Sequence, residues 1–328
     1  SCGSTMFVAL KCLDVGTGDV VLSNCFTLAP VPGAVAHAGA TLRLVDVTDD
    51  LTIDLDDLER KAAGAKVLLL SHMRGHIADM ARVVEICRRH RIALVEDCAH
   101  TMGAGWDGRP TGSFGAIGCF SLQSYKHANG GEGGLLVTDD DDIAARAILH
   151  SGSYMHWRGH QARPADAVFE RWKYTTPNFS LRLSNLVAAI VRPQMGAALA
   201  DRCARWNQRY HWLAEGLAKL PGVYLPHRPP QEQYVQSSIQ FLLRERGAAQ
   251  MQRFVAAAAE RGVNVKWFGA DEPLGFTSNW KSWRYADAQP ELPNASRVLA
   301  GLCDLRVPLT LTEADCARIV HAIGEALA

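Results

Sequence analysis

The first half of the chain alternates short β-prone runs with segments of helical spacing, and this alternation limits the folds that it can adopt. The runs are apolar and bounded by glycine or polar residues, whereas residues 78–90 repeat apolar side chains at helical spacing and end in a basic turn. Strands that alternate with helices predict a largely parallel sheet covered on both faces. The predicted strands are residues 20–22, 42–46, 66–72, 92–96, 116–121 and 134–138.

The second half predicts a long helix followed by a smaller α+β unit. Helical spacing covers residues 182–200, with a bend expected at Pro193, and continues over residues 202–219 to a Leu-Pro-Gly breaker. Strands are expected at residues 235–243 and 263–267, helices at 248–261 and 313–327, and a loop in the Trp-rich stretch 267–283. We therefore predict a large domain, residues 1–200, and a linker helix with a small C-terminal domain, residues 201–328.

Charge and composition favour a protein that acts on small molecules. Lys+Arg and Asp+Glu both number 34, so a net charge of zero predicts neither a nucleic-acid partner nor a membrane surface. The longest apolar tracts fall short of the roughly 20 residues of a membrane helix, and no leader pattern precedes them, so we expect a cytoplasmic protein. The nine cysteines are scattered without a C-x-x-C pair, which predicts buried thiols and no metal or redox centre.

An acidic residue ends one of the predicted buried strands. Asp97 follows residues 92–96 and precedes Cys98, Ala99 and His100. Ligands of open α/β sheets gather at the carboxyl ends of the strands, so Asp97 is placed where a ligand would bind. An aspartate in this position is also, and more often, a helix cap or turn former.

A lysine lies in a glycine-rich crossing between two apolar strands. Ser121 ends the first strand, Lys126 follows five residues later, and a run of four glycines leads into the next strand. Glycine lets a ligand approach the backbone closely. Lysine is usually a solvated surface residue, but a lysine held out of water here would act as a neutral amine.

The first residues combine small and hydroxyl side chains ahead of an apolar helical run, residues 7–13. Backbone N–H groups and the dipole at such a helix start bind phosphate. An ordinary N-cap gives the same pattern.

Together these segments resemble the sugar aminotransferases of the DegT/DnrJ/StrS family, which depend on pyridoxal 5'-phosphate (PLP) and have the aspartate aminotransferase type of fold. The matches keep their order over nearly the whole chain. They are Gly3, Ser4 and Thr5 for Gly-Thr-Ala, residues 24–27 for Pro-Ser-Phe-Thr, His72 to Met80 for His-x-x-Gly-x-x-Ala-Asp-Met, residues 96–100 for Glu-Asp-x-Ala-Gln/His, residues 112–115 for Gly-Ser-Phe-Gly, and Ser121 with Lys126. The resemblance implies an α/β protein of PLP fold type I, with a mainly parallel sheet in the large domain.

The resemblance also implies a role for each matched residue. Lys126 would hold PLP as an internal aldimine and then shuttle a proton, Asp97 would pair with the pyridine nitrogen, and His100 would bond near the phenolic oxygen. The implied cofactor-binding residues are Gly3, Ser4, Thr5, Thr27, Asp97, His100, Ser121, Lys126, Asn178 and Ser180. Arg182, Tyr125 and Trp267 are the substrate candidates, and no metal ligand is expected.

The implied reaction moves an amino group from glutamate or glutamine to the ketone of a nucleotide-linked sugar or of a cyclitol. The tract 122–126 and the glycines after it look closer to the cyclitol branch. The implied assembly is a homodimer with shared active sites, in which residues 176–185 of one subunit reach the phosphate of the other.

Three features depart from the family pattern. Leu28 follows Thr27 where an aromatic residue usually stacks on the pyridine ring, and Ser180, Leu181 and Arg182 stand where the family has Asn-Tyr/Phe-Arg. The segment that precedes the phosphate motif in the family is expected ahead of Ser1.

Two other functions on the same fold stay open. One is a dehydratase, in which histidine replaces the lysine, and the other is a non-catalytic regulatory protein. The adjacent His127 allows a register slip of one residue, but the interval from Ser121 favours Lys126.

Overall fold

The computed structural model, which describes residues 1–287, 289 and 291–328, has a central six-stranded sheet. Its strands are β1 (Val20–Asn24), β2 (Thr41–Val45), β3 (Val67–Ser71), β4 (Ala93–Asp97), β7 (Ile117–Ser121) and β8 (Gly134–Val137). They lie in the order β2-β1-β3-β4-β7-β8, and only β8 is antiparallel to its neighbour. The predicted α/β class and mainly parallel sheet are confirmed.

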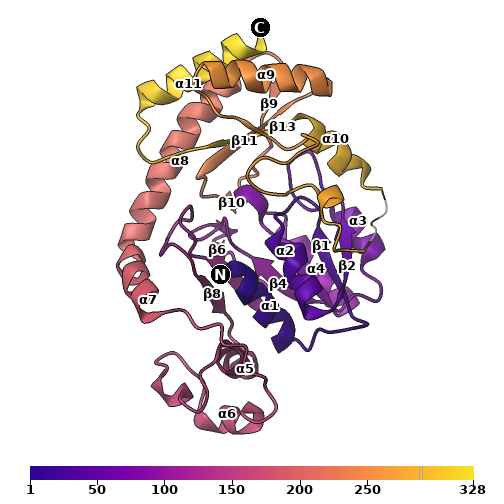
Figure 1. Cartoon of the computed structure of the whole chain (residues 1–328), viewed down its shortest axis with the longest axis vertical. Helices are drawn as coiled ribbons and strands as arrows, with labels where there is room; N and C mark the ends of the chain where they lie inside the picture. Colours follow the sequence, from indigo (N-terminus) through magenta and orange to yellow (C-terminus); the bar gives the residue numbers. More distant parts are fainter. Residues whose placement is uncertain (288, 290) are drawn as a thin grey trace.

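Helices cover both faces of this sheet (Figure 1). They are α1 (Cys2–Cys12), α2 (Pro30–Ala38), α3 (Leu55–Lys61), α4 (Met80–His90) and α5 (Asp141–Ser151). One apolar core joins α1 and α2 to the face that carries Val67 and Leu69, and a second joins α3 and α4 to the face of Leu68 and Leu70. The continuous apolar runs of the inner strands follow from this double coverage.

Alternation along β4 sends its last two side chains to opposite faces. Val95 belongs to the core beneath α1, and Leu94 to the core beneath α4. Since side chains alternate along a strand, Asp97 points to the α1 side and Glu96 to the α4 side. The contacts agree, because Asp97 meets the Cys2 thiol of α1 whereas Glu96 meets the loop at residues 112–115.

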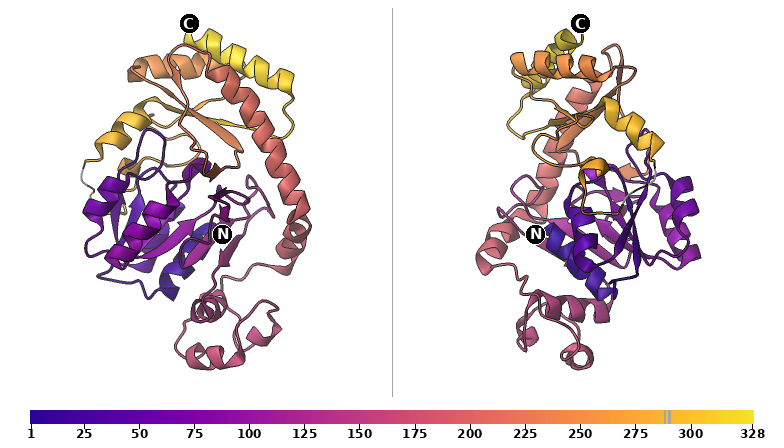
Figure 2. Two further views of the ribbon diagram at one scale, coloured as in Figure 1. Left: turned by 180° about the vertical axis from the view of Figure 1, so that it is seen from behind. Right: turned by 45° about the vertical axis from the view of Figure 1, so that its right-hand side comes forward.

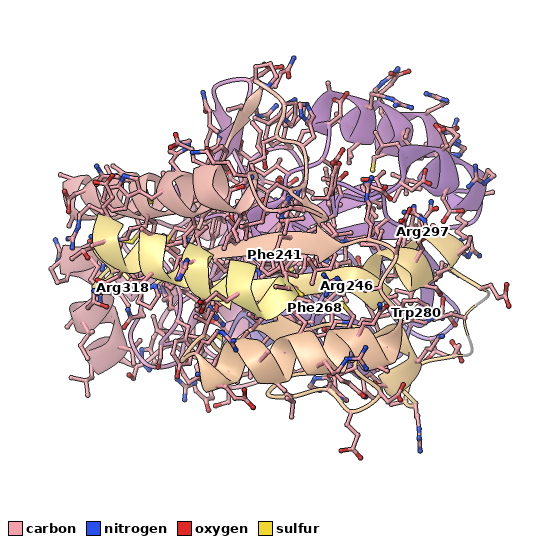
Figure 3. The ribbon with its side chains drawn as sticks, turned by 90° about the horizontal axis from the view of Figure 1, so that it is seen from above. Phe241, Arg246, Phe268, Trp280, Arg297 and Arg318 are labelled. Atoms are coloured by element: carbon pink, nitrogen blue, oxygen red, sulfur yellow. The ribbon has the colours of Figure 1, made fainter. Side chains whose placement is uncertain are left out.

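A second, antiparallel sheet is built from the later part of the chain. Its strands, in the order β12-β13-β11-β9, are β12 (Lys266–Trp267), β13 (Leu302–Arg306), β11 (Ser238–Leu243) and β9 (Val223–Tyr224). The helices α8 (Ala197–Leu217), α9 (Ala248–Glu260) and α11 (Glu313–Leu327) share its core, and α10 (Pro293–Gly301) precedes β13. Figure 3 shows α9 and α11 side by side across this sheet, with Phe241 of β11 between the layers.

The long helix α8 runs along one side of the molecule from the first sheet to the second (Figure 2). A three-stranded sheet also connects the two parts, since β10 (Glu232–Gln233) pairs with β5 (Gly105–Trp106), which pairs with β6 (Arg109–Pro110). At the far end α5 packs against α6 (Asp166–Trp172). The predicted domain boundary at residue 200 falls inside α8 and stays a prediction.

The predicted helix over residues 182–200 is wrong in two places. Helix α7 (Asn185–Val191) begins three residues later because the Ser184 hydroxyl caps it by accepting from Val187 N. A 3₁₀ turn at Arg192–Gln194 and Gly196, at φ 63°, then separate α7 from α8, so the break is larger than a bend at Pro193. Arg182 therefore lies in the loop ahead of the helix.

Other predicted elements are shorter in the structure. The strand expected at 235–243 pairs only from Ser238, and that at 263–267 only over Lys266–Trp267. All nine cysteines are buried and none forms a disulfide. None of the helices within the described residues combines the length and apolar character needed to cross a bilayer.

Candidate active site

Three predicted residues meet at the carboxyl end of the central sheet. Asp97 ends β4, beside β7, and Lys126 follows β7 in the glycine-rich crossing. The Lys126 Nζ lies 2.9 Å from His100 Nε2. Asp97 and His100 are buried and Lys126 is half-buried, so the cluster holds a lysine, a histidine and a carboxylate in a largely dry place.

The surroundings lower the pKa of the Lys126 amine to about 8. Burial is the largest cause, the Asp97 carboxylate opposes it, and the Arg74 and Arg306 charges act with it. A neutral amine keeps the lone pair that a nucleophile or base needs.

Both histidines beside the lysine are neutral, but only His100 can act with it. Burial lowers the pKa of His100 well below its usual value, and the charges of Lys126 and Arg74 lower it further. His127 is buried against Trp206 of α8, with ring centroids 5.1 Å apart, and burial lowers its pKa to about 3. His127 thus packs into the core while Lys126 reaches His100, and the assignment of Lys126 from the Ser121 interval stays a prediction.

The Asp97 carboxylate accepts a donor on each oxygen. Ser71 Oγ donates to Oδ2 over 2.8 Å, and Ala99 N donates to Oδ1 over 3.1 Å. The Cys2 thiol is a weaker donor to Oδ1 at 3.7 Å. Thr27, predicted to bind the cofactor, donates to Ser71 Oγ over 2.8 Å and reaches Asp97 only through that serine.

Glu96, next to Asp97 in the chain, has a structural role. It accepts from the backbone N–H groups of Gly112, Phe114 and Gly115 and meets His72 Nε2 at 3.1 Å. These contacts hold its pKa below the usual range against the opposing effect of burial. The ligating atoms of His72, Glu96 and Cys98 lie within 4.8 Å of one another. The hydrogen bonds just described already occupy the Glu96 carboxylate, so the group does not need a metal ion to explain it.

The predicted phosphate residues lie near the start of α1. Ser4 and Thr5 belong to its first turns, Gly3 lies between the Pro30 and Ser1 side chains, and Ser121 Oγ accepts one long bond of 3.4 Å from Gln123 N. Ser4, Thr5 and Arg182 line one cavity of about 880 Å³ between α1, β8, α5 and the loop before α7. The structure thus brings Arg182 to the same cavity as two of the phosphate candidates.

The remaining candidates occupy other places. Asn178 Oδ1 accepts from Ser180 N, so these two residues form a local turn. Tyr125 is 69% exposed, and the guanidinium of Arg306 on β13 lies 5.4 Å above its ring. Trp267 donates its indole N–H to Ala300 O over 2.8 Å and packs against the core of the second sheet, which is a structural role.

Sequence reasoning missed a buried arginine of this site. Arg74 follows β3 in a 3₁₀ turn at φ 56°, and its Nη2 lies 2.8 Å from Asp304 Oδ2 of β13 as an ion pair. Its side chain is buried and stacks over Phe276, 5.0 Å from the ring centroid. A buried charged residue at positive φ is costly, and such strain is concentrated at functional sites. The signal in the sequence is an arginine between His72 and Gly75 of the matched motif.

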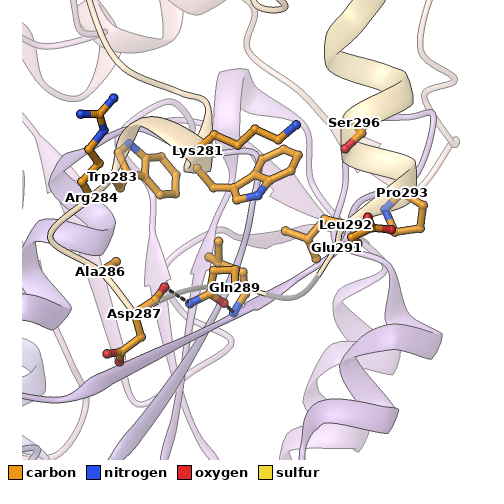
Figure 4. Close-up of a pocket in the computed structure, with 12 residues that line it drawn as sticks. Lys281, Trp283, Arg284, Ala286, Asp287, Gln289, Glu291, Leu292, Pro293 and Ser296 are labelled. Atoms are coloured by element: carbon orange, nitrogen blue, oxygen red, sulfur yellow. Dashed lines mark hydrogen bonds between the residues drawn. The ribbon is translucent and has the colours of Figure 1, made fainter.

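A second cavity, of about 670 Å³, lies away from this cluster. Figure 4 shows it with the indole of Trp283 and the side chains of Lys281 and Gln289 around it, and Trp280 also lines it. Gln289 bonds to the backbone of β2, the edge strand, and β1 and β3 separate that strand from β4. The Trp-rich loop therefore lines a cavity at the sheet edge.

The cluster fits a PLP group by the chemistry of its donors. Lys126 supplies an amine whose pKa is lowered to about 8, and Asp97 keeps acceptor capacity because each oxygen has two lone-pair sites and one strong donor. The Ser121 hydroxyl is engaged only by a long bond, and the first amides of α1 are those that a phosphate would occupy. Amine, carboxylate and phosphate cradle correspond to the aldehyde, pyridine nitrogen and phosphate of PLP.

Comparison with known proteins agrees with this geometry. The model of the DegT/DnrJ/EryC1/StrS aminotransferase family matches residues 1–324. The chain belongs to this family. A solved structure has the same fold: AtS13 from Actinomadura melliaura superimposes with a TM-score of 0.82 at 28% identity, covering 99% of this chain and 84% of that one.

Two curated relatives illustrate the range of the DegT/DnrJ/EryC1/StrS family. L-glutamine:scyllo-inosose aminotransferase of Streptomyces griseus is 41% identical over 147 residues, which are 44% of this chain and 34% of that protein. GDP-perosamine synthase of Caulobacter vibrioides is 31% identical over 228 residues, 68% of this chain and 58% of that protein. The chain thus spans about a third to three fifths of the length of these relatives.

Proposed function

We propose that this chain carries the active site of a PLP-dependent aminotransferase. The observation that supports this most is the Lys126 amine, with its pKa lowered to about 8, lying 2.9 Å from the neutral His100 ring at the strand end that carries Asp97. PLP, when bound, supplies the electron sink that the transfer of an amino group needs. Lys126 would anchor it and afterwards move a proton at its Nζ.

The other residues orient and shield the reacting groups. Asp97 would accept the N–H of a protonated pyridine nitrogen, which would keep the ring electron-poor. His100, neutral and hydrogen-bonded to Lys126 Nζ, holds the amine in place. Burial of Asp97 and His100 excludes water, so these charge interactions are stronger than in solution.

Two relatives favour a cyclitol ketone as acceptor and glutamine as donor. The Streptomyces griseus protein is named for both, and so is a putative aminotransferase of 3-amino-2,3-dideoxy-scyllo-inosose from Micromonospora echinospora, 35% identical over 193 residues. The GDP-perosamine synthase instead represents nucleotide-linked sugars. We propose glutamine or glutamate as donor and a keto-cyclitol as acceptor, with a nucleotide-linked keto-sugar as the second candidate.

A two-part experiment tests this function. Borohydride reduction of the PLP-treated protein, followed by peptide mapping, should place the pyridoxyl group on Lys126. Glutamine should then bleach the yellow colour of the unreduced protein, and a keto-cyclitol should restore it. A label on Lys11 or Lys173, or colour that no amino donor changes, contradicts the proposal and favours a non-catalytic protein.

We also propose that two copies share their sites. Large apolar side chains are exposed along the segment that ends in α7, including Tyr154 at 60%, Tyr174 at 80% and Leu186 at 71%. Exposed apolar side chains gathered in one segment are typical of a protein interface.

A further inference from the structure

Two hydroxyl groups connect Asp97 to the neighbouring strands. Ser71 Oγ donates to Asp97 Oδ2 and Thr27 Oγ1 donates to Ser71 Oγ, each over 2.8 Å. All three side chains are buried. An ionised carboxylate only accepts hydrogen bonds, so the single Ser71 proton points to Asp97 and the Thr27 proton points to Ser71. The direction of both bonds is therefore fixed.

The backbone of Ser71 is also held. Ser71 lies opposite Asp97 in the parallel register of β3 and β4. The side chain of Asn24, at the end of β1, accepts from Ser71 N over 2.9 Å and donates to Ser71 O over 3.0 Å. These bonds fix the Ser71 peptide and therefore the point from which its side chain extends, and the bond from Thr27 Oγ1 orients the hydroxyl.

This arrangement restrains the rotation of the Asp97 carboxylate. Oδ2 is bound by Ser71, and Oδ1 by Ala99 N at 3.1 Å, so a turn about the bond to the carboxyl carbon would break both bonds. Hydrogen bonds to a charged group are stronger than those between neutral groups. Each oxygen keeps a second lone-pair site for a ligand.

We propose that Ser71, oriented by Thr27, is a positioning residue that holds Asp97 in the direction in which it accepts the pyridinium N–H of PLP. The inference rests on the proposed function, because it takes Asp97 as the partner of the ring. Ser71 touches neither the ring nor the substrate in this role. Its effect is exerted through the carboxylate.

The same sheet contains a matched control. Ser23 lies on β1, its side chain is completely buried, and its hydroxyl has no hydrogen-bond partner among the described residues. Val21 of the same strand shares the α1-side core with Val67 and Leu69, so by alternation Ser23 and Ser71 point to the same face. Removing either hydroxyl deletes one buried oxygen beneath α1, but only Ser71 contacts Asp97.

The experiment measures PLP binding by full-length Ser71→Ala, Thr27→Val, Ser23→Ala and Asp97→Asn. The readouts are the dissociation constant from an absorbance titration and the protonation of the ring from the ¹⁵N shift of labelled PLP. We expect Ser71→Ala to bind PLP about tenfold more weakly, about 1.4 kcal/mol, with the nitrogen shifted toward its neutral form. Thr27→Val should change the dissociation constant and the ¹⁵N shift in the same direction, but by less. Ser23→Ala should match the unaltered chain in both readouts.

If Ser71→Ala and Ser23→Ala behave alike in both readouts while Asp97→Asn changes clearly, the inference about Ser71 fails and the proposed function still stands. If the unaltered chain binds no PLP, the proposed function fails and the inference fails with it. Circular dichroism of each variant shows whether it is folded. If Ser71→Ala does not fold, Thr27→Val decides, because valine keeps the shape of threonine and removes only the hydroxyl.

Discussion

At the scale of single residues, the surroundings of Lys126 shift its pKa far from that of an ordinary lysine. The same side chain in water would be almost fully protonated at neutral pH. Here burial lowers the pKa of Lys126 most, while the Asp97 charge raises that pKa and the Arg74 charge lowers it. The pH dependence of PLP attachment therefore reports the pKa of Lys126 in its surroundings.

We expect the rate of covalent PLP attachment to rise with pH through a midpoint near 8. With a pKa of about 8, about half of the Lys126 amines are neutral at pH 8 and about a tenth at pH 7, against fewer than about one in a thousand for an ordinary lysine. Because only the neutral amine attacks an aldehyde, the rate falls as pH drops below 8. Stopped-flow absorbance between pH 6 and 10 checks this, with Lys126→Ala as the blank; a midpoint near 10.4 would mean that the amine is solvated.

A second prediction concerns the buried pair of Arg74 and Asp304. Arg74→Met and Asp304→Asn should each destabilise the fold by about 3–5 kcal/mol, because each leaves a buried charge without its partner. The double variant should lose less stability than the two single variants together, since neither charge of the pair remains. Urea unfolding of the four proteins measures the coupling. Strict additivity would show that the two charges do not interact.

The sequence indicated Asp97, His100 and Lys126 as site candidates but gave no sign of the residues that support them. Asp97, His100 and Lys126 belong to short motifs at strand ends, and parallel strands bring such ends together whatever the loops do. Ser71 and Asp304 gave no comparable signal, because an isolated serine at the end of an apolar strand, or an aspartate within one, has many ordinary explanations. Their roles depend on the β3–β4 register and on β13, which lies far away in the chain.

At the scale of elements, two glycines bring the loop after β6 close to β7. A Cβ on Gly118 of β7 would lie 2.5 Å from Gly112 O, closer than any real contact. Gly112 itself stands at φ 85° and donates its N–H to Glu96. Strand β7 and the loop therefore pack backbone to backbone beside β4.

We expect Gly118→Ala to destabilise the chain by about 1–3 kcal/mol or more, because the added methyl group forces backbone atoms apart. Gly33→Ala is the matched control. Gly33 lies in α2 with open space around it, so alanine there should stabilise the helix by about 0.5–1 kcal/mol. Chemical denaturation of both variants gives the comparison, and a loss as large in Gly33→Ala as in Gly118→Ala would refute this account.

The strands of the first sheet followed from the sequence, whereas several connections did not. Buried parallel strands leave continuous apolar runs, which made β3 and β4 recognisable. The break between α7 and α8 was missed because Gly196 was counted as part of a helical pattern, although it takes positive φ and ends the turn. Helix α11 was predicted with its observed bounds, since Thr312 and Asp315 form a clear capping box.

At the scale of the whole molecule, the loop before α7 connects the cavity at α1 with an exposed apolar surface. Arg182 lines this cavity, donates to Gly152 O over 2.7 Å and lies 5.4 Å from the ring of Tyr154. The loop is therefore held by its own chain on one side. On its other side the Leu181 side chain is exposed, whereas Phe179 and Leu183 pack against the cores of this chain.

Complementation tests whether the sites are shared. We expect Lys126→Ala and Arg182→Ala to be inactive alone, and mixed dimers to regain one working site and a fraction of the activity. Arg171→Ala, which loses an exposed bond to Asp142, is the control and should stay active alone. No recovery from subunits that are shown to exchange would place Arg182 in the site of its own chain.

The opposite directions of Glu96 and Asp97 have a consequence for how the gene can vary. A substitution elsewhere in β4 changes one side chain, but the loss or gain of one codon there exchanges the sides to which all the following residues point. The Glu96 carboxylate would then face α1, and the Asp97 carboxylate would face the loop at residues 112–115. In this lineage β4 should therefore keep a constant length.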